Sequence, residues 1–160
     1  MPCLRPPGSE ANEAGQKIAY QYHSRLKQDP QQERRWFIAR DRSYHGATIG
    51  ALGLSGHKSR KEMYKRILPN NTHFISPCNE WRDMKNDETK AQYLARLEEE
   101  LERKICELGP NTVAGVFIEP IVGAVSCANS LSGSFIGWID LTSLFRHLVA
   151  FPRCLVTLRL

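Results

Sequence analysis

Short apolar runs alternate with helical patterns through most of this chain, and that alternation constrains its fold more than any other feature. Residues 36–39 and 112–118 are largely apolar runs of the kind buried in a parallel sheet, and residues 73–76 are a third, shorter candidate strand. Segments with helical spacing separate these runs. The order predicts an α/β fold with a mostly parallel sheet, because parallel strands need a crossover connection between them.

The strongest helical pattern covers residues 88–108, between the candidate strands at residues 73–76 and 112–118. Its apolar residues recur at the spacings of three and four positions that place them on one face of a helix. Acidic and basic residues fill the other positions, and Gly109 and Pro110 follow as a stop signal. The apolar stripe, which we expect to face the core, consists of Leu94, Leu97, Leu101, Ile105 and Leu108.

Three further segments are expected to contain helix. A first helix is predicted over residues 10–26, with small residues on the side that lies against the sheet. That side consists of Ala11, Ala14, Ile18 and Tyr22. Residues 47–54 predict a short helix of small residues, and residues 58–68 form a basic amphipathic stretch.

Composition places the chain among ordinary globular proteins. Its 160 residues are 41% hydrophobic and 24% charged, enough for one domain with a buried core. The net charge of +5 is not gathered in one arm, which favours small anionic ligands over nucleic acid. The basic residues 58–66 leave nucleic-acid binding as an alternative, and that alternative predicts a steep salt dependence.

The same composition bears on location. No apolar run reaches the length of a membrane span, and no signal peptide is recognisable, so we expect no membrane partner. The five cysteines are dispersed and include no Cys-x-x-Cys pair. This pattern favours reduced thiols and a cytoplasmic location.

The residues before the first helix predict an anion site. Gly8 allows the backbone to approach a ligand closely, and Ser9 places a hydroxyl beside the unpaired N–H groups of a first helical turn. A helix that begins in this way can hold a phosphate group. The alternative is that Gly8 and Ser9 only cap the helix.

Two more candidate sites follow the expected strands. Tyr44 and His45 lie in a polar loop after the first strand, and Glu119 directly follows the last one. Ligands bind at the carboxyl ends of the strands in open parallel sheets. Taken singly, each site has a simpler alternative: a packed aromatic with a surface imidazole at Tyr44 and His45, and a strand-ending turn at Glu119.

Together these segments resemble a known family. The runs Gly-Ser-Glu-Ala-Asn-Glu-Ala at 8–14, Ser-Tyr-His-Gly-Ala-Thr at 43–48 and Gly-Val-Phe-Ile-Glu-Pro-Ile-Val-Gly-Ala at 115–124 occur in the order and spacing of the class-III aminotransferases. These are pyridoxal 5'-phosphate enzymes of fold type I. The resemblance implies that residues 1–124 form part of the three-layer α/β/α cofactor-binding large domain.

The resemblance also implies a role for each matching residue. Gly8 and Ser9 would bind the cofactor phosphate, and the ring of Tyr44 would stack on the pyridine ring. His45 is the neighbouring residue of the same motif, and Glu119 would lie beside the cofactor on the substrate side. The family transfers an amino group from an amine or amino acid to a keto acid or aldehyde, and it works as dimers, so a homodimer is implied.

The departures from the family pattern concern catalysis. The family lysine that bonds the cofactor aldehyde, and the aspartate that contacts the pyridine nitrogen, follow the Glu-Pro motif, but no lysine follows Lys104 here and Asp140 lacks the family context. We therefore assign no catalytic residue and no metal ligand, and we expect a truncated fragment that is inactive alone. Residues 125–160 are expected to be a non-homologous tail, aberrant or disordered. The alternative function is a non-catalytic α/β interaction module, or a fragment that dimerises with a full-length homologue.

Overall fold

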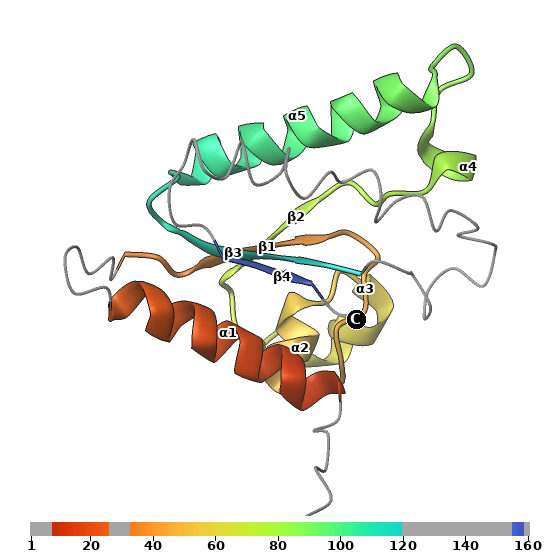
Figure 1. The fold of residues 1–160 in the computed structure, drawn as a ribbon. Helices are drawn as coiled ribbons and strands as arrows, with labels where there is room; N and C mark the ends of the chain where they lie inside the picture. The colour runs from red at the N-terminus through yellow and green to blue at the C-terminus, as the bar shows by residue number, and fades with distance from the viewer. Residues whose placement is uncertain (1–7, 26–32, 120–154, 159–160) are drawn as a thin grey trace, which may run out of the picture.

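The computed structural model describes residues 8–25, 33–119 and 155–158, and these form an α/β fold (Figure 1). The helices and strands follow one another along the chain in the alternating order that the sequence predicts. In chain order they are α1 (Gly8–Ser24), β1 (Trp36–Arg40), α2 (Ile49–Leu54), α3 (Lys58–Lys61), the 3₁₀ helix η1 (Glu62–Tyr64), β2 (Thr72–Ile75), α4 (Glu80–Asp83), α5 (Lys90–Leu108), β3 (Val113–Ile118) and β4 (Leu155–Leu158).

The four strands form one sheet in the order β2-β1-β3-β4, and every neighbouring pair is parallel. In the register, Ile38 of β1 lies opposite His73 of β2 on one side and Val116 of β3 on the other. The predicted parallel sheet is therefore confirmed. Since β1 and β3 are neighbours, the residues that follow these two strands emerge at the same edge of the sheet.

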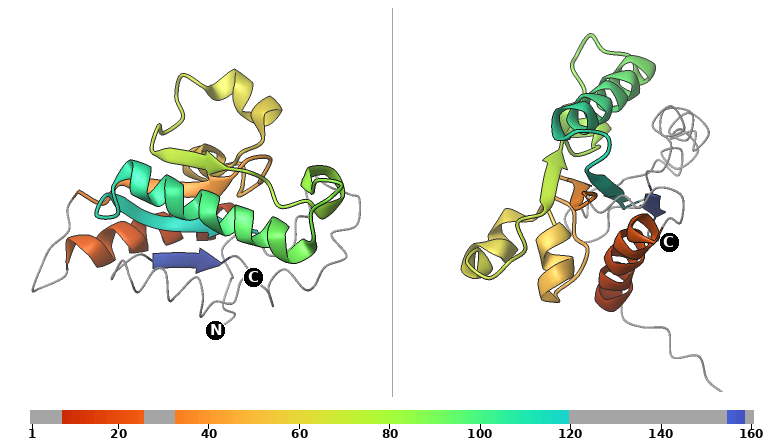
Figure 2. Two further views of the ribbon diagram at one scale, coloured as in Figure 1. Left: turned by 90° about the horizontal axis from the view of Figure 1, so that it is seen from above. Right: turned by 90° about the vertical axis from the view of Figure 1, so that its left-hand side faces the viewer.

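Helices cover both faces of the sheet. α5 lies over one face, and α1 and α2 lie together under the other (Figures 1 and 2). A separate apolar cluster fills each layer. The cluster under α5 consists of Ile38, Ile75, Leu101, Ile105, Val113, Val116 and Ile118, with Leu108 at its margin. The cluster on the side of α1 and α2 consists of Ala19, Phe37, Ala39, Leu54, Ala114 and Phe117, with Phe74 at its margin.

The long helix α5 confirms the prediction from its apolar stripe. Leu94, Leu97, Leu101 and Ile105 are all buried. The helix begins two residues later than predicted, at Lys90, because Thr89 and Gln92 form a capping box that fixes its first turn. It ends at Gly109, whose φ of 90° lies in the region that favours glycine.

The prediction for the buried side of α1 is wrong. Ile18 is 59% exposed and Tyr22 is 46% exposed, and Ala11 and Ala14 also face solvent. The residues that α1 buries are Asn12, Ala19 and His23. Two of these three are polar, and their side chains reach hydrogen-bond partners on other segments, which a count of apolar residues does not detect.

The segments between β1 and α5 are less regular than predicted. α2 begins at Ile49 instead of residue 47, and the basic stretch forms only α3 and η1, ending at Tyr64. The four-residue helix α4 was not predicted. Short helices of this kind depend on tertiary contacts, because a single turn is not stable by itself.

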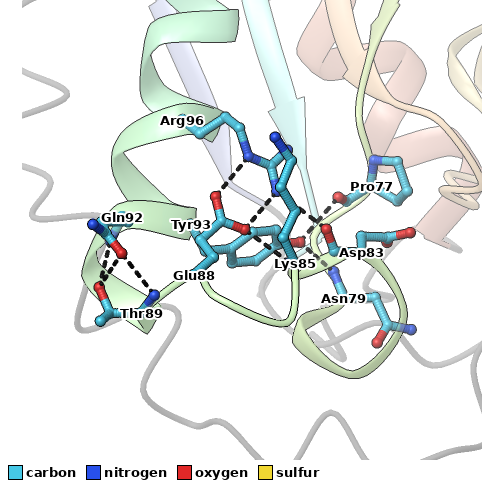
Figure 3. Close-up of polar contacts among 9 residues, drawn as sticks. All are labelled: Pro77, Asn79, Asp83, Lys85, Glu88, Thr89, Gln92, Tyr93 and Arg96. Atoms are coloured by element: carbon cyan, nitrogen blue, oxygen red, sulfur yellow. Dashed lines mark hydrogen bonds and ion pairs between the residues drawn. The ribbon is translucent and has the colours of Figure 1, made fainter.

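The turn between β2 and α5 is held by contacts among its own residues (Figure 3). Arg96 donates to both carboxylate oxygens of Glu88, at 2.8 and 2.9 Å, and to the backbone carbonyl of Asp83 at 3.1 Å. The Tyr93 hydroxyl accepts from the backbone N–H of Asn79 at 2.9 Å. We call this set, with the capping box of Thr89, the outer corner.

Most of the tail expected over residues 125–160 lies outside the described residues. The exception is β4 (Leu155–Leu158), which the sequence analysis did not predict and which pairs with β3. Among the helices that the structure describes, none is both long and apolar enough to cross a membrane. Within the same residues, no group of histidine, cysteine and acidic side chains has the arrangement of a metal site.

Candidate functional site

The segments that follow β1 and β3 are joined by a direct hydrogen bond. The loop after β1 places the backbone N–H of Tyr44 3.1 Å from Oε2 of Glu119, the residue that follows β3. Glu119 is buried, although it carries a carboxyl group. Two of the sites predicted from the sequence are therefore brought together at one edge of the sheet.

Ser9 lies in the first turn of α1 and contacts the same loop. Its Oγ accepts a hydrogen bond from the backbone N–H of Ala47 at 3.0 Å. Gly46 has a φ of 140°, and a Cβ there would lie 2.7 Å from the Cα of Ser9, too close for any side chain. Because the Ser9 oxygen acts as acceptor towards Ala47, its own hydroxyl proton remains to be donated to a ligand.

Two more side chains of α1 hold the loop. The Asn12 amide donates to the backbone carbonyl of His45, and Oε1 of Glu13 accepts from the backbone N–H of Gly50 at 2.7 Å. Ser9, Asn12 and Glu13 lie at positions i, i+3 and i+4, so they share one side of α1. We call these three residues the α1 clamp. Asn12 and Glu13 were not predicted as site residues, although their helical spacing from Ser9 is visible in the sequence.

His45 is a packed residue and not a surface imidazole. Its side chain is 1% exposed, and its ring meets that of Phe117 edge-on, with centroids 6.0 Å apart. Its backbone N–H donates to Oγ of Ser55 at 2.9 Å. These contacts fix the backbone between Tyr44 and Gly46, so His45 contributes to the site by positioning its two neighbours.

The ring of Tyr44 has a cation on one face. The guanidinium carbon of Arg60, from α3, lies 4.4 Å from the centre of that ring. A second flat group can stack on Tyr44 only at the opposite face, or by displacing Arg60. Arg60 was not predicted as a site residue, because nothing in the local sequence pattern indicates a contact with Tyr44.

A second basic side chain of α3 is tied to the scaffold. Lys61 donates to the backbone carbonyl of Gly53 at 3.0 Å, and its ammonium group lies 4.6 Å from the centre of the Phe74 ring. Burial lowers the pKa of Lys61, and the nearby carboxylate of Asp41 opposes that shift. The ammonium group of Lys61 therefore stabilises the contact between α2 and β2.

This geometry fits an anionic, flat ligand. The first turn of α1 supplies backbone N–H groups and the Ser9 hydroxyl for an anion, since a helix start leaves those groups without partners. Tyr44 supplies an aromatic face nearby in the same loop, and Glu119 supplies a carboxylate. The structure thus joins all the site segments that the sequence predicted, through the loop of residues 44–47.

Comparisons with known proteins show which family the chain belongs to. A model of the family "Aminotransferase class-III" matches residues 4–136, a dozen residues beyond the point where the sequence resemblance was expected to end. An aminotransferase from Gibberella zeae is 44% identical over 119 residues, covering 73% of this chain. An uncharacterised aminotransferase from Schizosaccharomyces pombe is 40% identical over 129 residues, covering 80% of this chain.

Solved structures of similar proteins show the same fold. A PMP-bound aminotransferase from Vibrio fluvialis has a TM-score of 0.76 with 26% identity, covering 95% of this chain and 31% of that one. An omega-aminotransferase from Paracoccus denitrificans has a TM-score of 0.75 with 27% identity, covering 92% of this chain and 30% of that one. The chain spans only 23% and 28% of the two fungal relatives.

Proposed function

Because this chain belongs to the class-III aminotransferases, a family that uses pyridoxal 5'-phosphate, we propose that its described residues are part of the cofactor-binding domain of a transaminase. One observation carries the proposal. The loop of residues 44–47 joins the start of α1, the ring of Tyr44 and the carboxylate of Glu119 at one edge of the sheet.

The cofactor phosphate would bind at the start of α1. Gly8 and Ser9 provide backbone N–H groups there, and the hydroxyl of Ser9 has a proton to donate because its oxygen accepts from Ala47. A phosphate also suits the positive end of the helix dipole. The α1 clamp supports this position, since it fixes the loop against the same turn.

The rest of the cofactor would lie along the loop. Tyr44 would offer the ring face that Arg60 does not occupy, His45 would hold the loop backbone, and Glu119 would lie on the substrate side. When bound, pyridoxal phosphate supplies an aldehyde and an electron-withdrawing ring for amino transfer between an amine or amino acid and a keto acid or aldehyde. Tyr44 and Glu119 would orient and flank that ring.

The proposal includes no catalytic lysine within these 160 residues. The eight lysines are Lys17, Lys27, Lys58, Lys61, Lys65, Lys85, Lys90 and Lys104, and none lies after the Glu119 motif, where the family lysine is expected. We therefore propose that the chain as given binds the cofactor without transferring amino groups. Treating the chain with pyridoxal phosphate and borohydride should label no single lysine, and a stoichiometric adduct on one lysine would overturn this part.

The phosphate site is tested by comparing two ligands and two variants. Pyridoxal phosphate should bind the chain more tightly than pyridoxal, and Ser9→Ala should reduce that difference about tenfold, the effect of one charge-assisted hydrogen bond. Ser24→Ala is the matched control, because Ser24 lies at the other end of α1, where its hydroxyl donates to the backbone carbonyl of Tyr20. Equal affinity of the unchanged chain for both ligands would contradict the site.

A second candidate function is a fragment that pairs with another copy or with a full-length homologue. The exposed Ile18 and Tyr22 of α1 favour it, because apolar side chains that face solvent in the described part of the chain suit a protein contact. Sedimentation analysis of the chain alone, and with a full-length relative, separates a monomer from a homodimer or a mixed complex.

The proposed location is the cytoplasm, where thiols stay reduced. Within the described residues Cys78 and Cys106 are free thiols. Some relatives carry other locations in their names, such as the "Probable gamma-aminobutyrate transaminase 3, mitochondrial" of Oryza sativa. Fractionation of cells that express the chain with a small tag would decide between these compartments.

A further inference from the structure

The three basic side chains of α3 are held in three different ways. Lys58 is an exposed residue that faces Asp41 at 4.0 Å, and Lys61 donates to the carbonyl of Gly53. Arg60 instead lies over the ring of Tyr44. Within the described part of the chain, no carboxylate forms an ion pair with Arg60.

The contact with Tyr44 leaves the hydrogen-bonding capacity of Arg60 available. A guanidinium stacks on an aromatic ring through its flat face, while its five N–H donors point outward in its own plane. These donors match the two oxygens of a carboxylate in a bidentate pair. Tyr44 therefore holds a cation at the site without consuming the groups that would recognise an anion.

Tyr44 contacts two groups of opposite charge. Tyr44 contacts the guanidinium of Arg60 through its ring and the carboxylate of Glu119 through its backbone N–H. A ligand that lies against Tyr44 is thus offered a cation and an anion by two different segments. A molecule with both an amino group and a carboxylate complements this pair better than a plain amine does.

We propose that Arg60 is a specificity-determining residue that recognises the carboxylate of the substrate, so the substrate class is amino acids and oxo acids and not simple amines. This assignment rests on the proposed function: with the cofactor on the other face of Tyr44, the substrate carboxylate would reach the guanidinium of Arg60 past the edge of the Tyr44 ring. The cofactor phosphate is a second anion of related chemistry, and the experiment below separates it from the substrate carboxylate.

The first test uses the chain loaded with pyridoxal phosphate and two probes, 4-aminobutyrate and propylamine, which differ by one carboxylate. By calorimetry, 4-aminobutyrate should bind at least about tenfold more tightly, the effect of one charge-assisted pair. Arg60→Gln should abolish the preference, and Arg60→Lys should reduce it because the flat bidentate donor is lost. Lys58→Gln is the matched control, since it removes the same charge from the same short helix away from the ring.

The second test needs no cofactor, so it decides the role of Arg60 even if the chain binds no pyridoxal phosphate. In the cofactor-free chain labelled with ¹⁵N-arginine, 4-aminobutyrate should shift the Nε–H signal that Arg60→Lys removes, and propylamine should not. The assignment is overturned if neither the loaded nor the free chain distinguishes the probes. It is also overturned if Arg60→Gln weakens pyridoxal phosphate relative to pyridoxal, because Arg60 then binds the phosphate. Failure of the unchanged chain to bind pyridoxal phosphate would instead contradict the proposed function.

Discussion

The loop after β1 and the outer corner after β2 both leave the same edge of the sheet, but they are held in opposite ways. Asn12, Glu13 and Ser9 reach the first loop from 33, 37 and 38 residues away in the sequence. The outer corner is tied by partners 3 to 14 residues apart, such as Thr89 with Gln92 and Tyr93 with Asn79. The candidate site therefore depends on tertiary packing, and the outer corner depends on local structure.

The largest effect is expected from Gly46→Ala in the first loop. A Cβ at this position meets Ser9 backbone at 2.7 Å, and the φ of 140° is unfavourable for alanine, so we expect a loss of about 3 kcal/mol in the free energy of unfolding. Gly109→Ala is the control, because Gly109 also has a positive φ but a Cβ there would meet Thr112 at 3.6 Å. Urea denaturation should show a loss of only about 1 kcal/mol for Gly109→Ala, and equal losses would contradict the close contact with Ser9.

A smaller effect is expected from Asn12→Ala in the α1 clamp. The change leaves the buried carbonyl of His45 without its amide donor, which costs about 2 kcal/mol. Hydrogen exchange should show the loosening in the loop of residues 44–50 and not in α5. If the loss of protection is spread evenly over both regions, the loop is not held separately by α1.

A single substitution in the outer corner should lower the free energy of unfolding less than one in the first loop or the α1 clamp. Thr89→Ala removes the capping box of α5, and we expect a loss of about 1 kcal/mol, measured as a lower urea midpoint. The affinity for pyridoxal phosphate should not change, because the corner does not contact the loop of residues 44–47 in any described hydrogen bond. A change in affinity would show that the two regions are coupled.

Acid should act on α1 and on the outer corner through one titratable side chain in each, and this is the smallest effect at neutral pH. Burial and the charge of Arg34 lower the pKa of His23 below its usual 6.5, so the unfolded chain binds the proton first and stability falls as pH drops below about 6.5. The hydrogen bond with Arg96 lowers the pKa of Glu88 to about 2, so its contribution is lost only between about pH 4.5 and 2.

Circular dichroism melts from pH 8 to about 2 would measure both contributions. His23→Gln should remove the loss below about pH 6.5, because glutamine can still donate to the Ala114 carbonyl but does not titrate in that range. Glu88→Gln should keep the loss of stability below about pH 6.5 and reduce the loss between about pH 4.5 and 2. If His23→Gln keeps the full loss below pH 6.5, another group is responsible for it.

Sequence reasoning succeeded where structure is set locally or by repeated apolar residues. The stripe from Leu94 to Ile105 could be found because each member obeys the helical period, and the strands β1 and β3 because both faces are buried. It also predicted that Tyr44 and Glu119 lie at one edge, since parallel strands end together. These predictions need no knowledge of which distant side chains meet.

The failures concern residues whose roles depend on distant partners. Asn12 and His23 are buried because each has a hydrogen-bond partner on another segment, so the apolar side chosen for α1 was wrong. Arg60 contacts Tyr44 from sixteen positions further along the sequence, and no local pattern indicates that contact. The roles of Gly8, Ser9, Tyr44, His45 and Glu119 towards the cofactor stay predictions from the family resemblance.

The strand order β2-β1-β3-β4 has a consequence for the kinetics of folding. The central pair joins β1 to β3, which are separated by β2, α5 and the segments between them, and every pair in the sheet is parallel. Closing such long loops costs entropy before the strands contribute any stability, so parallel sheets fold slowly. We expect α5 to form early from its own capping and spacing, and the site loop to become ordered only after β1 and β3 have met. Changes in the α1 clamp should then speed unfolding while leaving the folding rate nearly constant.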